Sequence, residues 1–288
     1  MIRQTASQWS FHNVPRLGAA LAFYTMLSLA PLLVVVVAIA SLAFGEQAAR
    51  GQLQWQIQDM VGQQSATAIQ SMLTSAHKPG AGIFASAFGV LMLLVGASAV
   101  FGELRDALNL IWEAEQKPGS GLWGMVKYRF FSFSMVLGIG FLLLVSLVIS
   151  AGLSFIGHAL GNYFPLPEPV LQIASLVISF VFITLLFALI YKFVPDVSIH
   201  WNDVWIGAAF TSLLFSVGKL LIGLYLGKAS VGSAYGAAGS LVILLVWIFY
   251  SSQIFFFGAE FTHVFAVRQG SLVGKKTEAK APELAVRS

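Results

Sequence analysis

Six long apolar segments follow one another along this chain of 288 residues, separated by shorter polar stretches. Each has at least the roughly 20 residues that a helix needs to cross a hydrocarbon core about 30 Å thick. None alternates polar and apolar residues as a membrane-spanning β-strand does. We therefore predict an all-α, polytopic membrane protein. Its six transmembrane helices are expected near residues 17–44, 81–101, 130–156, 170–191, 204–226 and 237–257.

The segments outside these spans complete the predicted organisation. Residues 1–16 mix apolar and polar side chains as in a short helix at the cytoplasmic membrane surface, with a frayed tail as the alternative. Apolar residues in the outer segment 45–80 recur near helical spacing, which predicts amphipathic helices over the outer end of the bundle. Residues 17–267 then form one membrane domain, and the polar residues 268–288 are expected to be a disordered cytoplasmic tail.

Lys and Arg residues between the spans predict the orientation. If the N-terminus is cytoplasmic, twelve of them fall in inner segments and three in outer segments. This is the positive-inside bias, so both termini are expected in the cytoplasm (N-in/C-in). The net charge of +4 follows from this topology and from attraction to anionic lipid. We therefore infer no nucleic-acid partner. The first apolar segment is also too long for a cleaved signal peptide.

Composition and motifs argue against an enzyme. Hydrophobic residues make up 58% of the chain and charged residues 10%, and there is no cysteine to form a disulfide, a thiolate metal site or a nucleophile. The five histidines are scattered, and no HExxH, GxSxG or GxxxxGKS/T motif occurs. An acidic group near the second span is interpreted as a solvated face; it comprises Glu103, Asp106, Glu113 and Glu115. We expect no catalytic residue, metal or cofactor.

Small residues and one proline predict how the helices pack. Four small residues of the second span recur at intervals of three to seven residues, and such spacing lets helix backbones approach closely. This expected packing surface comprises Gly82, Ala85, Gly89 and Gly96. Pro31 in the first span lacks a backbone N–H, which predicts a kink that acts as a hinge or as a fixed bend. The hydroxyl of Ser28 is available to bond a carbonyl that the proline frees.

Two ionisable residues within apolar segments mark a candidate site. Such groups cost about 2.5–3.5 kcal/mol at membrane depth and face the protein interior or water. Lys219 lies in the fifth span and Glu260 near the inner end of the sixth, each with polar residues on the same helical face. We interpret these faces as a polar substrate path between the fifth and sixth spans. Its predicted lining is Ser212, Ser216, Lys219, Tyr250, Gln253 and Glu260.

A structural interpretation of the same charges is also open. Lys219 and Glu260 differ in depth by about 12 Å at 1.5 Å per residue, too far for a direct bond. Arg105 ends the second span at the inner level and is the better partner for Glu260 as an interfacial ion pair. Lys219 then extends its side chain outward to the headgroups.

Three motifs in order along the chain resemble a known family. They are LAFYTMLSLAP at 21–31, FGELRDALNLIW at 101–112, and YGAAGSLVILLVWIFY at 235–250, which leads into GAEF at 258–261. Over residues 10–267 the chain resembles the YihY/BrkB family of bacterial inner-membrane proteins. The resemblance implies six membrane helices with cytoplasmic ends in a bacterial inner membrane. Some members are tied to serum resistance and virulence. Others were once labelled ribonuclease BN, an activity for which this chain lacks metal ligands.

The function expected from these features is transport. A helical bundle with a polar interior, close packing and a proline kink has the parts needed to move an amphiphilic, lipid-like or small organic solute. The alternative is a non-catalytic protein that scaffolds envelope assembly. Membrane lipid is the expected surrounding, and a second copy of the chain or another envelope protein is a candidate partner.

Overall fold

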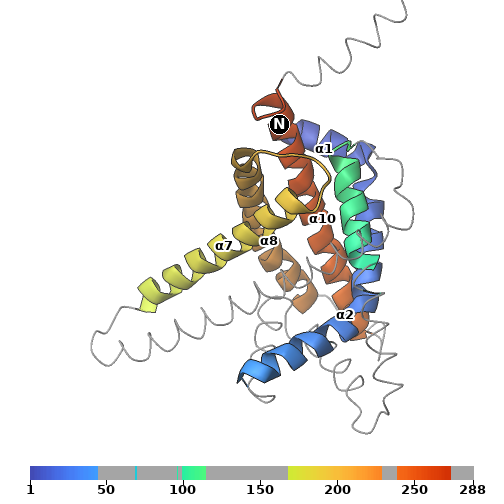
Figure 1. Cartoon of the computed structure of the whole chain (residues 1–288). Coiled ribbons are helices and arrows are strands. Elements are labelled where there is room, and N and C mark those ends of the chain that lie inside the picture. Colours follow the sequence, from blue (N-terminus) through green and yellow to red (C-terminus); the bar gives the residue numbers. More distant parts are fainter. Residues whose placement is uncertain (45–68, 70–95, 97–98, 115–167, 229–238, 274–288) are drawn as a thin grey trace, which may run out of the picture.

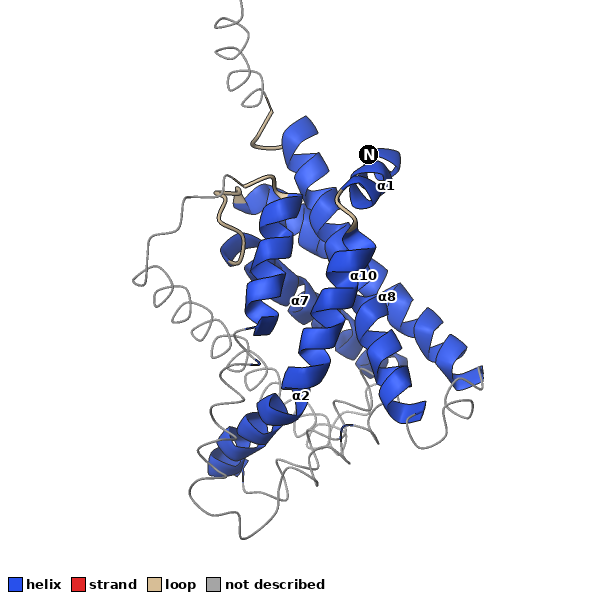
Figure 2. Ribbon diagram, turned by 90° about the vertical axis from the view of Figure 1, so that its right-hand side faces the viewer, coloured by secondary structure: helices blue, strands red, loops and turns tan. Residues whose placement is uncertain are grey.

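The computed structural model describes residues 1–44, 69, 96, 99–114, 168–228 and 239–273. All regular structure in this part of the chain is helical (Figures 1 and 2), as the apolar pattern predicts. Residues 99–111 form one helical segment. The labelled helices are α1 (Ile2–Phe11), α2 (Val14–Phe44), α7 (Glu168–Phe193), α8 (Trp201–Lys228) and α10 (Gly239–Arg268).

Four of the six predicted spans lie in α2, α7, α8 and α10. In the described residues, Trp201–Tyr225 and Leu241–Arg268 are helices long and apolar enough to cross a membrane, and Val14–Leu29 and Ser179–Phe193 are shorter apolar helices. The predicted span at 130–156, most of the one at 81–101 and nearly all of segment 45–80 lie outside the described residues. Six spans and their orientation therefore stay a prediction.

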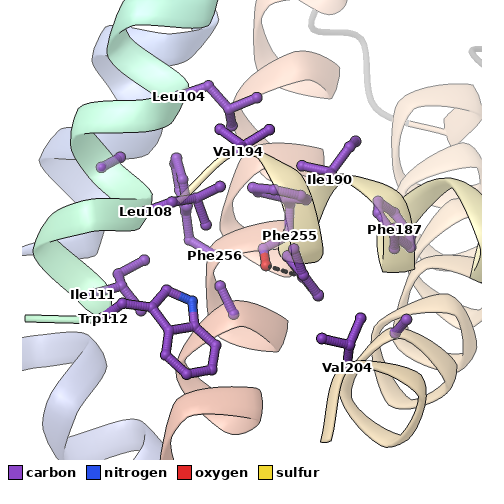
Figure 3. Close-up of a cluster of buried hydrophobic side chains, with 14 of the residues drawn as sticks. Leu104, Leu108, Ile111, Trp112, Phe187, Ile190, Val194, Val204, Phe255 and Phe256 are labelled. Carbon is purple, nitrogen blue, oxygen red and sulfur yellow. Dashed lines mark hydrogen bonds between the residues drawn. The ribbon is translucent and has the colours of Figure 1, made fainter. Parts of the chain in front are cut away.

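Helix α10 is the centre of the described bundle. It packs against α8, α2 and α1, and α7 packs against α8 (Figures 1 and 2). The main buried cluster draws side chains from the first half of α2, from residues 104–112, from α7 and the connection that follows it, and from α8 and α10; Figure 3 draws part of it. Large apolar side chains remain exposed along α8, which suits a helix that faces lipid. They include Leu213, Val217, Leu220, Leu221 and Leu224.

Two glycine–threonine contacts bring α8 and α10 close together. A Cβ atom on Gly207 would lie 1.8 Å from Thr262 Oγ1, and one on Gly258 would lie 1.9 Å from Thr211 Oγ1. Each threonine hydroxyl donates to a carbonyl one turn earlier in its own helix, at 2.7 Å, so it is satisfied without a partner across the interface. Because α8 and α10 run antiparallel, Gly207 of α8 meets Thr262 of α10 and, one turn further along, Thr211 of α8 meets Gly258 of α10. This is the small-residue packing typical of membrane helices.

The buried tyrosine of α7 ties three helices together. Tyr191 has no exposed surface, and its hydroxyl donates to the Phe255 carbonyl of α10 at 2.6 Å. The same oxygen lies 3.1 Å from Thr211 Oγ1 of α8. These bonds satisfy the phenol at a position where water is excluded, and they fix α7 against the α8–α10 pair.

One end of the bundle gathers the start of the chain, the α7–α8 connection and the end of α10; we call it the N-terminal end (Figure 1). Buried Asp203, in the first turn of α8, accepts bonds from the Ser271 backbone N–H at 2.9 Å and the Ser271 hydroxyl at 2.6 Å. Residues 268–273 belong to the predicted tail, but in the structure they turn back onto α8, where Ser271 bonds Asp203. Residues 274–288 lie outside the described part.

Helix α2 runs without interruption through Pro31, and Figure 1 shows it changing direction in its later part. The hydroxyl of Ser28 bonds the Thr25 carbonyl at 3.1 Å, not the Leu27 carbonyl that Pro31 leaves without its donor. A Cβ on Gly96 would lie 3.1 Å from Ser28 Cβ, so Gly96 approaches α2 closely. The other small residues of that predicted packing surface, Gly82, Ala85 and Gly89, lie outside the described residues.

Candidate functional site

A tight corner between α1 and α2 positions the first residue of the site. Asn13 adopts a left-handed conformation with φ of 52°, which asparagine tolerates better than most residues. Its N–H closes α1 on the Ser10 carbonyl at 3.2 Å, and its own carbonyl accepts the Arg16 N–H of α2 at 2.9 Å. Pro15 sits in the first turn of α2, where its missing N–H costs nothing. The chain thus turns a corner at Asn13, and His12 beside it is buried.

His12 and Glu260 form a buried pair. Nδ1 of His12 lies 2.6 Å from Oε1 of Glu260 in α10. The side chains are 5% and 0% exposed, respectively. The second carboxyl oxygen, Oε2, is buried with no hydrogen-bond partner in the described part of the chain. A carboxylate accepts bonds on both oxygens, so this one is only half satisfied.

Arg105 does not pair with Glu260, so the predicted ion pair is wrong. The Arg105 guanidinium binds Asp196 of the α7–α8 connection through two bonds, from Nε at 2.9 Å and from the second terminal nitrogen. Asn109 bonds the same carboxylate at 2.7 Å and accepts the Asp196 backbone N–H at 2.7 Å.

Gln253 faces α2, on the same side of α10 as Glu260. A Cβ on Gly18 of α2 would lie 2.0 Å from Gln253 Nε2. Both polar atoms of the Gln253 amide are buried and have no partner among the described residues. Tyr250 instead lies against Gly218 of α8, where a Cβ would be 3.3 Å from its hydroxyl. The expected single face between the fifth and sixth spans is therefore divided, because Gln253 and Glu260 line the α2–α10 interface.

The remaining predicted lining residues lie on α8. Ser212 is buried, and its hydroxyl has no hydrogen-bond partner in the described structure. Ser216 donates to the Ser212 carbonyl at 2.8 Å, which satisfies it within its own helix. Lys219 is half-buried. The structure does not join these three residues to Glu260 by any contact described above.

Residues from the end of the 99–111 segment and from α10 surround the His12–Glu260 pair. Glu113 lies close enough to Glu260 for their charges to interact. It occupies a left-handed position with φ of 49°, and the Ala114 N–H bonds the Asn109 carbonyl at 2.9 Å, which is the usual way a helix ends at such a residue. The Trp112 ring lies 5.2 Å from the ring of His263 in α10. The Trp112 indole N–H is buried without a partner in the described residues.

Two further carboxyl groups sit at the N-terminal end, outside the spans. Burial raises the pKa of Glu103, and Asp106 raises it further while Arg16 lowers it. Burial also raises the pKa of Asp106, against the lowering effect of Arg105. Among the described residues no three acidic or histidine side chains lie together in a way that would hold a metal ion. His12, Glu260 and their described neighbours offer hydrogen bonding and proton exchange.

The sequence profile of the family described as "Virulence factor BrkB" matches residues 5–283. The chain belongs to the BrkB family. It is 29% identical to a "UPF0761 membrane protein" of Verminephrobacter eiseniae over 251 residues, which cover 85% of this chain and 57% of the relative. It is 28% identical to one of Tolumonas auensis over 255 residues, covering 87% and 80%. No solved structure matches.

The chain spans 57% and 58% of the length of the relatives from Verminephrobacter eiseniae and Albidiferax ferrireducens. Neither the family description nor these relatives' names state an enzymatic activity. The comparisons establish an integral membrane protein of the BrkB family, in agreement with the resemblance carried by the three motifs.

His12 is the residue of the candidate site that the sequence alone did not reveal. The sequence around it, Phe-His-Asn-Val-Pro at 11–15, carries turn and helix-start residues that predict a corner. No local pattern shows that the ring reaches a residue 248 positions later. Asp196 was missed for the same reason, since its partners Arg105 and Asn109 lie in a distant segment.

Proposed function

We propose that this BrkB family protein is a six-helix protein of the bacterial inner membrane, with both termini in the cytoplasm, that moves an amphiphilic, lipid-like or small organic solute. The proposed path runs along the α2–α10 interface, past Gln253 and Glu260. The observation that carries the proposal is the pair of buried, incompletely bonded polar groups on the α2-facing side of a helix long enough to span the membrane.

Leaving those buried polar groups without hydrogen bonds costs free energy. A buried polar group without a partner costs about 1–3 kcal/mol, and an ionisable group within a membrane helix usually faces a functional interior. Gln253 offers an amide donor and acceptor, and Glu260 offers a free carboxyl oxygen. Passing polar groups of a solute, or the water that accompanies it, would supply the missing bonds. The apolar surroundings of α2 and α10 favour a solute that is itself partly apolar.

The charge distribution supports the proposed orientation. Arg3, Arg16, Arg105, Lys192 and Arg268 belong to segments that meet at the N-terminal end of the bundle (Figures 1 and 2). Two tryptophans at the start of α8, Trp201 and Trp205, are exposed at the same end, as is typical of a membrane–water interface. A cytoplasmic N-terminal end agrees with both features.

The test is solute movement in proteoliposomes that contain the full chain. Labelled lipids and small organic anions are followed for the wild type, Glu260→Gln, Gln253→Leu and Lys219→Met, with folding checked by size-exclusion chromatography. Gln269→Leu is the matched control, because this exposed glutamine follows the same helix. We expect movement in the wild type and in the control, and its loss in well-folded Glu260→Gln and Gln253→Leu. A loss in Lys219→Met as well would extend the path to α8.

The opposite result would favour the scaffold alternative. If no tested solute moves faster than in empty liposomes, or if Glu260→Gln and Gln253→Leu move it as the wild type does, the proposed path is wrong. Sensitivity to substitution on loops and lipid-facing surfaces would then indicate a protein that acts through partners.

A further inference from the structure

The access of water to the His12–Glu260 pair is one-sided. Glu260 has no exposed surface, whereas His12 keeps 5% of its side chain exposed and lies at the corner that ends α1. In the described structure the imidazole therefore stands between the N-terminal end of the bundle and the carboxyl group. The 2.6 Å separation of Nδ1 and Oε1 is short for a bond from nitrogen to oxygen and is typical of a pair in which at least one group carries charge.

The bonding of the carboxyl group fits two protonation states. Ionised, Glu260 needs donors on both oxygens, but Oε2 has none among the described residues. Protonated, it needs fewer donors and costs less to bury. In neither protonation state do the described surroundings supply every hydrogen bond that the carboxyl group can make, so they do not strongly favour one state over the other. Histidine is the side chain suited to passing a proton to such a group near neutral pH.

We propose that His12 and Glu260 form a proton-binding site that is loaded from the N-terminal end of the bundle through the imidazole. With Glu260 ionised, Nδ1 of His12 holds the ring proton and donates it to Oε1. Nε2 then takes a proton from water as the Nδ1 proton moves to Oε1. The products are a neutral carboxyl group and a neutral imidazole in its other tautomer, and one proton has been taken up. The reverse steps release it.

The charged groups around the pair are few. The 99–114 segment contributes Glu113, and α10 contributes His263, one turn beyond Glu260. On α2, exposed Arg16 lies near Glu103. Arg3 is the single charged side chain of α1 and is exposed. Asp203 of α8 is bound to Ser271. Among the described residues, Glu113 and His263 are thus the groups expected to shift the pH at which the site loads.

The first measurement is the infrared difference spectrum of the reconstituted full chain between acidic and alkaline buffer. We expect a band of a protonated carboxyl group that appears on acidification, is lost in Glu260→Gln and is kept in Glu103→Gln. Glu103 is the matched control because it is a half-buried carboxyl group at the same end. The absence of any pH-dependent band that requires Glu260 would overturn the proposal.

The second measurement is the rate at which this band forms after a rapid drop in pH. We expect His12→Gln, which keeps a hydrogen-bonding side chain but cannot relay a proton, to slow it about 100-fold. His200→Gln, a change of an exposed histidine at the same end, should leave the rate unchanged. A wild-type rate in His12→Gln would show that the proton enters by another route and would overturn the relay.

A third measurement covers the case in which Glu260→Gln does not fold. Ring ¹⁵N signals of His12, identified by their loss in His12→Gln, should report a change of tautomer with pH in the wild-type protein. One fixed tautomer across the range would overturn the proposal. None of these readouts needs a solute, so their failure leaves the proposed transport function standing. If transport is also found, we expect proton uptake at this site to accompany solute movement, a step that rests on the proposed function.

Discussion

The hydrogen bond between His12 and Glu260 joins the first corner of the chain to the last described helix, across 248 positions. Its contribution to stability depends on burial, because the Glu260 carboxyl group cannot bond water instead when His12 is removed. Glu260 has no exposed surface. The pair is therefore both a candidate site and a structural tie for α1.

Replacing Glu260 with alanine should destabilise the protein by about 1–3 kcal/mol, because His12 loses its partner while it stays buried. Glu260→Gln, which can still bond the imidazole, should lose less. Denaturant unfolding in detergent measures both, with exposed Gln269→Ala as the control. Equal stability of Glu260→Ala and the wild type would show that the pair does not hold α1 in place.

Asn13 gives a test of the corner itself. Valine at this left-handed position should cost about 1–2 kcal/mol, because its branched side chain clashes with the backbone. Glycine, which adopts this conformation freely, should cost much less. Unfolding curves of Asn13→Val and Asn13→Gly measure the difference. Identical curves would mean that the corner is not needed for stability.

Glu260 could be found from the sequence because an ionisable residue near the end of an apolar segment is visible without any structure. Its predicted partner, Arg105, was wrong because a sequence gives the position of a residue along its helix but not the helices that it faces. The role of His12 could not be predicted because it depends on a contact with Glu260 in a distant segment of the chain.

At the scale of elements, the α8–α10 contact is the closest approach between long helices that the glycines reveal. Gly207 faces Thr262, and Gly258 faces Thr211. Because glycine has no side chain, each of these positions leaves room for the opposing threonine, and the two helices pack closely. Neither contact was predicted: each helix carries a glycine and a threonine four residues apart, at 207 and 211 and at 258 and 262, but this spacing does not show which helix packs against it.

Gly207→Ala should destabilise the protein by about 1–3 kcal/mol through overpacking, since the added methyl group would lie 1.8 Å from Thr262 Oγ1. Gly223→Ala in the same helix is the matched control. A Cβ there meets nothing within 4 Å, and alanine favours a helix by up to about 1 kcal/mol. Thermal unfolding in detergent should rank the control above the wild type and Gly207→Ala below it. The same loss in both variants would contradict the close contact.

Helix positions were the most predictable feature of this fold. The length of the apolar segments alone predicted helices where α2, α7, α8 and α10 are found, because a helix makes its backbone hydrogen bonds within one segment, as lipid requires. The end of α10 was less predictable. Residues 268–273 include Leu272 and Val273 but show no apolar periodicity, and Ser271 returns to Asp203 through two hydrogen bonds that no sequence pattern indicates.

On the scale of the whole molecule, the described helices share one end where the N-terminus, the α7–α8 connection and the end of α10 meet (Figure 1). The proposed topology places this end in the cytoplasm. Since the chain has no cysteine, single cysteines report on it without background. Asn202→Cys and Gln269→Cys should react with a membrane-impermeant thiol reagent from the cytoplasmic side, and Lys228→Cys, at the far end of α8, from the other. Labelling of all three from one side would contradict the topology.

We propose a polar path that passes Gln253 at the α2–α10 interface. The most direct measurement places a single cysteine at Gln253 in the folded, reconstituted protein and follows its reaction with a small polar thiol reagent. Phe256→Cys is the control, three residues further along α10 and without exposed surface in the apolar core. We predict that the cysteine at 253 reacts many times faster than the one at 256 and that Glu260→Gln alters its rate. Equal, slow reaction at both positions would show a dry interface and no path.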